Sequence, residues 1–194
     1  MKFIAGIAGA AALCATTALA GGHANWSSVD DQSSVAFGSV KNSEFGEVHH
    51  FTDVSGKVSE AGALEISINL ASVQTNIDIR NERMNEHVFG AGGLTATLTG
   101  QIDMEALAAL GNGDTMLTDI EAELSFAGTE NDIEARMLVA RLGDDRVLVT
   151  TADFIMLSTD DLGITAGIDK LMELASLDSI TRVTPVSVRM VFEK

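Results

Sequence analysis

The sequence predicts an all-β protein built of antiparallel strands with two short helices. Three observations support this: apolar and polar residues alternate with period two, glycines recur between the alternating segments, and only two segments show helical spacing. The clearest alternation lies at 64–70, and the pattern recurs at 94–102, 120–126 and 186–192. One polar face is typical of antiparallel sheets, because parallel sheets are covered on both sides.

Two further segments are apolar on both faces. These are 133–142 (IEARMLVARL) and 147–154 (VLVTTADF), joined by the turn sequence Gly143-Asp144-Asp145. The short turn predicts a hairpin. Strands of this kind either lie under another element or line a cavity that is itself apolar.

The first predicted helix runs from Thr75 to about Val88, where Thr75-x-x-Asp78 resembles a capping box. The second runs from Thr165 to Leu177, because one apolar stripe recurs at helical spacing: Ile164, Ile168, Leu171, Met172 and Ala175. The segment 103–110 (DMEALAAL) fits either a third short helix or a strand edge.

About eight strands with few helices suit a closed eight-stranded antiparallel barrel, which is wide enough to hold one small ligand or to fill itself with side chains. A two-sheet sandwich fits the same strand pattern. Periodicity alone leaves both architectures open.

The first twenty residues have the features of a signal peptide. Lys2 supplies a positive start, an Ala-rich apolar stretch follows, and Ala18-Leu19-Ala20 is a cleavage signal. Cys14, the one cysteine, lies in this segment. A lipoprotein signal would need a small residue before the cysteine, and Leu13 stands there, so we expect Cys14 to be removed with the peptide. We therefore predict a cleaved segment 1–20, a single domain over 21–194, and a mature protein without disulfides or Cys-based metal sites.

The charge excludes two classes of partner. Twelve basic residues stand against 28 acidic ones, the formal net charge is −16, and no basic cluster occurs. Nucleic acids and anionic membrane surfaces both require a basic footprint, so we expect neither as a partner. A lipid partner would be one molecule held in a cavity.

The chain resembles the YceI-like family, lipocalin-like proteins of the bacterial periplasm. The residues that carry the resemblance are Ser33-Ser34-Val35-Ala36-Phe37, Val54-Ser55-Gly56, Ser72-Val73-Gln74-Thr75, Arg80-Asn81-Glu82 and Asp161-Leu162-Gly163. The resemblance implies an extended antiparallel barrel in the periplasm. It also implies a lumen that holds a long isoprenoid or similar amphiphile, in a family associated with polyprenoid or quinone binding and carriage.

Two segments depart from the family pattern. At 124–132 (LSFAGTEND) an acid and an amide replace the family's basic residue and proline. At 158–163 (STDDLG) the family's Asn-Arg-x-Asp-Phe-Gly loop is weakened. We expect the barrel to persist through both changes, whereas the identity of the cargo depends on them.

The sequence offers few candidates for catalysis or metal binding. Neighbouring residues on a strand point to opposite faces, so His49 and His50 cannot bind one metal ion, and we expect histidines at a strand end or rim. The acidic pairs are explained by turn chemistry and match no calcium loop: Asp30-Asp31, Asp144-Asp145 and Asp160-Asp161. We predict no enzyme activity, no metal and no required cofactor.

The remaining candidates for a site are apolar. We expect the barrel lining to include Phe37, Val54, Leu98, Phe126, Met137, Val139, Val149, Phe154 and Met190. The charged helix segment 80–83 (RNER) is expected to be solvated or internally paired. In the family it leads to the barrel mouth, where Arg80 or Arg83 could contact a lipid headgroup.

These residues lead to a primary reading and two alternatives. The primary reading is a binding protein that carries, stores or scavenges an isoprenoid or quinone-type lipid. A filled barrel that acts through a protein partner, or a secreted hydrolase or isomerase that uses His49 or His50, are the alternatives. A homodimer is also compatible with strands that are apolar on both faces.

Overall fold

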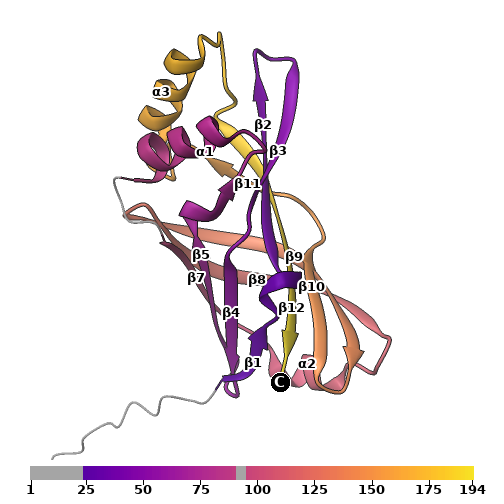
Figure 1. Ribbon diagram of the computed structural model, residues 1–194. Coiled ribbons are helices and arrows are strands. Elements are labelled where there is room, and N and C mark those ends of the chain that lie inside the picture. Colours follow the sequence, from indigo (N-terminus) through magenta and orange to yellow (C-terminus); the bar gives the residue numbers. More distant parts are fainter. Residues whose placement is uncertain (1–23, 91–94) are drawn as a thin grey trace, which may run out of the picture.

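The computed structural model describes residues 24–90 and 95–194, so the predicted signal peptide 1–20 lies outside the described residues. Within them, eight antiparallel strands close into a barrel (Figure 1). β12 closes the ring by pairing with β1 through Ser27↔Glu193 and Ser28↔Phe192. In ring order the strands are β1 (Ala24–Ser28), β4 (Val54–Ser59), β5 (Ala63–Asn69), β7 (Thr95–Gln101), β8 (Thr115–Phe126), β9 (Thr129–Gly143), β10 (Arg146–Thr151) and β12 (Val183–Glu193). The prediction of a barrel is confirmed, and the sandwich is excluded.

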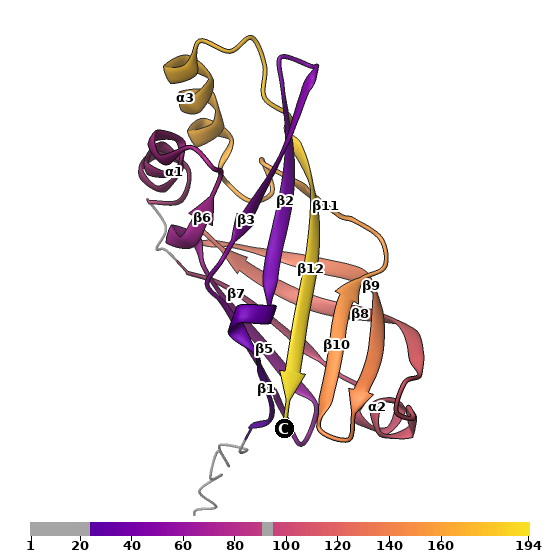
Figure 2. The ribbon, with the colours of Figure 1, turned by 45° about the vertical axis from the view of Figure 1, so that its right-hand side comes forward.

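Further strands of the same sheet extend the barrel beyond one end of the ring. The short 3₁₀ helix η1 (Asp30–Gln32) separates β1 from β2 (Ser34–Lys41). β1 pairs with the C-terminal end of β12, whereas β2 pairs with residues 186–189, nearer the start of β12. β2 and β3 (Phe45–Phe51) form a long hairpin that projects past the ring (Figure 2). β6 (Val73–Gln74), which follows the 3₁₀ helix η2 (Leu70–Ser72), pairs with β3, and β11 (Ile155–Ser158) pairs with β12.

Helices cover both ends of the barrel (Figure 1). α1 (Asp78–Met84) continues as the π-helix η3 (Asn85–Phe89), and α3 (Thr165–Ala175) packs against them at the end where the β2–β3 hairpin projects. α2 (Met104–Ala109) lies at the opposite end. The segment left open by periodicity is thus a helix, whose N-cap is Asp103: its carboxylate accepts from the backbone N–H groups of Glu105 and Ala106, both at 3.0 Å. No helix in the described ranges is long and apolar enough to cross a membrane.

The predicted capping box at Thr75 is wrong. The helix begins at Asp78, three residues later than expected. Thr75 Oγ1 and the Thr75 backbone N–H both donate to Asn81 Oδ1, at 2.6 and 2.9 Å. The polar contact therefore runs from the chain before the helix to a side chain within it. α3 starts at Thr165 as predicted and ends at Ala175, because Ser176 adopts the left-handed conformation that ends a helix.

A chain of aromatic rings connects the hairpin, the helical cap and the barrel wall. Phe37 stacks on Phe51 at 5.3 Å between ring centroids, Phe51 contacts Phe89 at 5.7 Å, and Phe89 contacts Phe126 at 6.1 Å. Phe89 is only 3% exposed. Burial of this ring on η3 holds the helical cap against the barrel.

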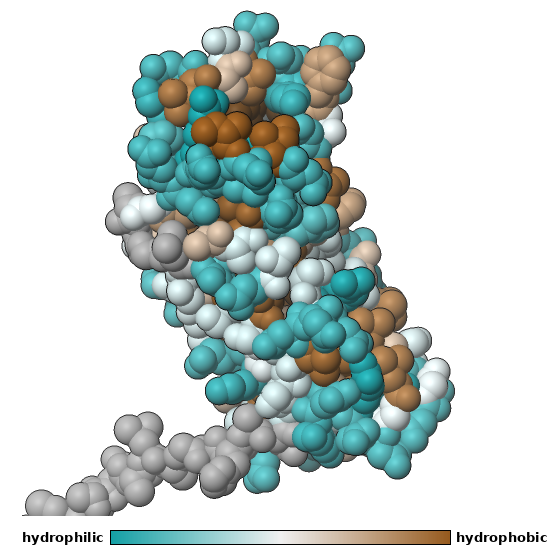
Figure 3. All heavy atoms as spheres, viewed as in Figure 1, coloured by the Kyte–Doolittle hydropathy of each residue, from teal (hydrophilic) through white to brown (hydrophobic). Residues whose placement is uncertain are grey.

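The surface near that cap also carries apolar side chains. Figure 3 shows apolar groups on the side of the molecule where α1 and α3 lie. Ile77 and Ile79, at the start of α1, are 46% and 52% exposed, and Phe45 at the hairpin tip is 53% exposed. Most of the remaining surface in this view is polar.

Candidate functional site: an apolar cavity with a polar end

The barrel encloses a cavity of about 380 Å³, which extends from α2 to the space beneath α3. This volume lies in the range of small-molecule binding sites. Its wall is mostly apolar and comes from every layer of the fold, because the inward residues of each strand alternate with outward polar ones. β9 shows the pattern most clearly, with four buried inward residues: Ile133, Ala135, Met137 and Val139.

Seven of the nine predicted lining residues lie in the wall of this cavity: Phe37, Leu98, Phe126, Met137, Val139, Val149 and Met190. Val54 is fully buried, but it belongs to the packed core and does not line the cavity. The prediction that Phe154 lines the cavity is wrong. β10 ends at Thr151, and Phe154 follows in the connection to β11 with 70% of its surface exposed.

Sequence reasoning missed the contribution of the helices to the wall. Val88 and Phe89 of η3, Ile168 of α3 and Leu107 of α2 all line the cavity. The one sequence signal for this contribution was the apolar stripe of α3. Such a stripe predicts that the helix packs on the protein, but it does not show that the helix covers a cavity. Trp26 of β1, the single tryptophan, also lines the wall and was not predicted.

The polar groups of the lining are grouped at two places. Beneath α3 the wall carries four hydroxyl residues, of which Thr159 is hydrogen-bonded to Thr165 of α3 at 2.9 Å. The other three, which we call the hydroxyl cluster, are Ser39 of β2, Thr181, and Thr184 of β12. Thr184 Oγ1 donates to the carbonyl of Gly38 at 2.6 Å, and the Thr181 backbone N–H donates to the carbonyl of Val40 at 2.9 Å. The two threonines therefore contact the backbone on either side of Ser39.

The second polar place in the wall is near α2, where the barrel is less completely paired. β7 pairs with β8 from Thr97↔Ser125 to Gly100↔Ala122 only, so the first half of β8 has no ladder with β7. Asp103 and Asp119 line the cavity there. They are its only charged lining residues in the part of the chain that the structure describes, and both are acidic.

His49 lies behind the hydroxyl cluster. It is 4% exposed, its Nε2 lies 3.1 Å from Ser39 Oγ, and its ring is tilted against Phe37 at 5.2 Å between centroids. Burial, helped by the positive charge of Arg80, lowers the pKa of His49 to about 4. The expected rim histidine is thus a buried, neutral one, whereas His50 is exposed on the other face, as the strand alternation requires.

The Ser39–His49 pair does not have the properties of an activated nucleophile. A general base works best with a pKa near the operating pH, and the pKa of His49 lies well below neutrality. The imidazole of a serine–histidine pair also needs an orienting group on its second nitrogen. Within the described residues His49 Nδ1 has no hydrogen-bond partner. The geometry favours a binding role over a catalytic one.

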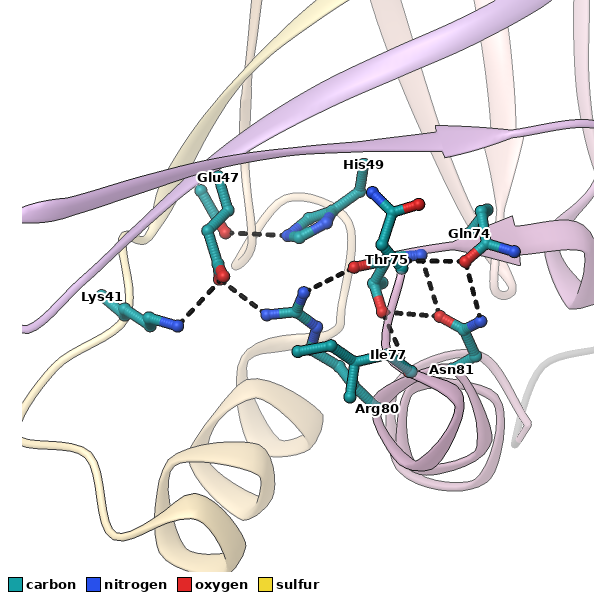
Figure 4. A network of polar contacts seen from close by, with 10 residues as sticks. Lys41, Glu47, His49, Gln74, Thr75, Ile77, Arg80 and Asn81 are labelled. Carbon is teal, nitrogen blue, oxygen red and sulfur yellow. Dashed lines mark hydrogen bonds and ion pairs between the residues drawn. The ribbon is translucent and has the colours of Figure 1, made fainter.

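A cluster of ion pairs joins the hairpin to α1 (Figure 4). Glu47 of β3 accepts from Lys41 at 3.0 Å and from Arg80 at 2.7 Å, and Arg80 also donates to the carbonyl of Thr75 at 2.7 Å. Partial burial opposes ionisation of Glu47, but these two cations outweigh it and lower its pKa. Glu47 thereby fixes the position of α1 over the end of the cavity.

The predicted headgroup contacts of Arg80 and Arg83 remain predictions. Arg80 is engaged with Glu47 and Thr75, and Arg83 approaches the carbonyl of Leu174 on α3 at 3.5 Å. Neither side chain lines the cavity. Among the residues described, no group of three or more His, Cys, Asp or Glu side chains gathers in the manner of a metal site.

Comparisons with known proteins agree with this architecture. The model of the YceI-like domain matches residues 26–190. The chain is similar to a polyisoprenoid binding domain from Saccharophagus degradans implicated in plant cell wall breakdown, with 35% identity and a TM-score of 0.86 over 88% of this chain and 99% of that one. BcnA of Burkholderia cenocepacia shares the fold, with 14% identity and a TM-score of 0.63 over 84% of this chain and 97% of that one. No curated protein sequence matches. The chain belongs to the YceI-like family.

Proposed function

We propose that this protein binds an isoprenoid or quinone-type lipid, with the apolar tail in the barrel cavity, and serves as its carrier, store or scavenger. The observation that carries the proposal is the apolar cavity of about 380 Å³ that runs between the two helical caps. Burial of apolar surface stabilises such a complex by about 25 cal/mol per Å². The similarity to a polyisoprenoid binding domain supports the same class of ligand.

The form of the cavity supports a slim aliphatic tail. Its wall combines aliphatic side chains and methionines, such as Met116, Met137 and Met190, which adapt to a flexible ligand. The cavity also argues against the alternative of a filled barrel that works only through a protein partner. The neutral state of His49 argues against the hydrolase or isomerase alternative.

The place of action follows from the predicted signal peptide. A signal peptide that is cleaved after Ala20 would direct the protein to the periplasm, where a container of this kind can hold a lipid or move it between membranes. The strong negative charge of the chain fits a container that does not adhere to anionic bilayers.

Trp26 supplies a direct test of binding, because it is the single tryptophan and lines the cavity. We expect its fluorescence to change saturably when a polyprenol or an isoprenoid quinone is added to the lipid-free protein. Val149→Gln, which places an amide in the apolar wall, should weaken binding about 5- to 100-fold. Val40→Gln, at a 40% exposed site outside the cavity, is the matched control and should bind as the wild type does. Equal affinities of the two variants would contradict a site in the lumen.

A further inference from the structure

The cavity is chemically asymmetric along β2 and β3. Moving outward, the inward pairs are Val35↔Phe51, Phe37↔His49 and Ser39↔Glu47, so this face of the hairpin changes from apolar side chains in the wall to a charged side chain, Glu47, just beyond it. The last pair lies beneath α1, where Arg80 contacts Glu47 (Figure 4). Besides the acidic region near α2, an amphiphile in this cavity would find a second polar environment, whose wall carries no charge, at the end covered by α1 and α3.

We propose that the hydroxyl cluster of Ser39, Thr181 and Thr184 binds the polar end of the cargo and that this end is an uncharged oxygen group, an alcohol or carbonyl, rather than a phosphate. The inference rests on the proposed function and adds to it the orientation of the lipid and the class of its headgroup.

The hydrogen bonds of the cluster leave it able to bind such a group. The hydroxyl protons of Thr184 and Thr181 are donated to the carbonyls of Gly38 and Val183, at 2.6 and 2.9 Å, so the threonine oxygens keep lone pairs that can accept a hydrogen bond from the cargo. Ser39 shares one hydrogen bond with His49.

The Ser39–His49 pair can present either polarity. A neutral imidazole has one N–H donor and one acceptor nitrogen. If His49 Nε2 donates to Ser39, the serine proton is free to bind a carbonyl. If Nε2 accepts from Ser39, the serine oxygen remains free to accept from an alcohol. His49 is 4% exposed and remains neutral at physiological pH, so it contributes no positive charge to hold an anion.

The other charges near the cavity also disfavour a phosphate. The charged side chains in its described wall are Asp103 and Asp119, and both would repel an anion. Lys41 and Arg80 lie close to the hydroxyl cluster, but both are bonded to Glu47 and neither reaches the wall. An anionic headgroup at Ser39 would therefore be buried without a paired cation, which is costly.

The test compares three ligands of equal chain length: a polyprenol, its monophosphate and the corresponding hydrocarbon, each titrated against the lipid-free protein by Trp26 fluorescence. We expect the alcohol to bind about three- to tenfold more tightly than the hydrocarbon, as one or two neutral hydrogen bonds allow. We expect the phosphate to bind at least about tenfold more weakly than the alcohol.

Variants of Ser39 assign the preference to the hydroxyl cluster. Ser39→Ala should reduce the preference for the alcohol over the hydrocarbon without abolishing it, because Thr181 and Thr184 can still accept a hydrogen bond, and Ser39→Thr, which restores a hydroxyl, should restore the preference in full. Ser67→Ala is the matched control, because Ser67 lies on β5 outside the cavity wall. It should retain the preference.

Three results would overturn the inference. Equal affinities of the wild type for alcohol and hydrocarbon would remove the headgroup site and leave the proposed function intact. Tighter binding of the phosphate, lost in Arg80→Gln, would transfer headgroup recognition to the ion-pair cluster. Failure of all three ligands and of an isoprenoid quinone to bind would refute the proposed function itself, and the headgroup site with it.

Discussion

Phe89 is the least exposed apolar side chain of the helical cap formed by α1, η3 and α3, and its removal should be strongly destabilising. The ring is 3% exposed and lies between Phe51 and Phe126, with centroid separations of 5.7 and 6.1 Å. Truncation of a buried phenylalanine to alanine costs about 3–5 kcal/mol. Because Phe89 borders an existing cavity, the neighbouring side chains cannot easily close the new space, and we expect Phe89→Ala to lose about 4 kcal/mol.

The assay is urea unfolding of the lipid-free protein, followed by circular dichroism. Bound lipid must be removed first, because any ligand of the native state adds to the free energy of unfolding. Phe154→Ala is the matched control: it deletes the same atoms at a site that is 70% exposed, and it should change the free energy of unfolding by less than about 0.5 kcal/mol. A loss below about 1 kcal/mol in Phe89→Ala, or equal losses in the two variants, would refute the packing described for the cap.

Two further predictions concern packing in the wall and pH dependence. A Cβ at Gly56 would lie 2.9 Å from Met190 Cε, which can move, and 3.1 and 3.2 Å from two ring atoms of the buried Phe192, which must also shift, so Gly56→Ala should lose about 1 kcal/mol in the same urea assay. Gly46→Ala, with open space around it, should lose almost nothing. The pKa of His49 is lower in the folded protein, about 4, than its ordinary value of 6.5, so protonation favours the unfolded chain and stability falls as the pH drops from about 6.5 toward 4. Between pH 7 and pH 5 this term amounts to about 2 kcal/mol. His49→Gln should flatten that decline and the exposed His50→Gln should not; an unchanged slope in His49→Gln would show that the buried histidine is not its source.

Most of the strands could be predicted from the sequence because each has one solvent-exposed polar face and one buried apolar face. The alternation at 64–70 corresponds to β5, and that at 186–192 lies within β12. The same alternation says which residues point inward but not which strands become neighbours. The closing contact between β1 and β12 and the displaced β2–β3 hairpin therefore required the structure, although the family resemblance correctly favoured a barrel.

The cavity wall could be predicted in its strands and not in its helices. Met137 and Val139 follow from the period-two pattern of β9. The pattern misplaced Phe154, because its strand ends three residues earlier and an exposed phenylalanine looks the same in a sequence as a buried one.

The hydroxyl cluster could not be predicted from local sequence patterns. It depends on the register Phe37↔His49, which places His49 beside Ser39, and on two threonines about 140 residues away in the sequence, Thr184 on β12 and Thr181 just before it. Single serines and threonines carry no signal of their own in a sequence rich in both. The buried state of His49 likewise depends on the neighbours that cover its face of β3, among them Phe37 and Ser39, which strand periodicity does not determine.

The central claim is that the cavity holds a lipid, and native mass spectrometry of the mature protein tests it most directly. The protein would be purified from its native host without detergent, and any bound species would then be extracted and identified. We predict a bound fraction whose extra mass corresponds to one isoprenoid-tailed molecule with an uncharged headgroup. A mass equal to that of the chain alone, with no uptake of added polyprenol or isoprenoid quinone, would contradict the account.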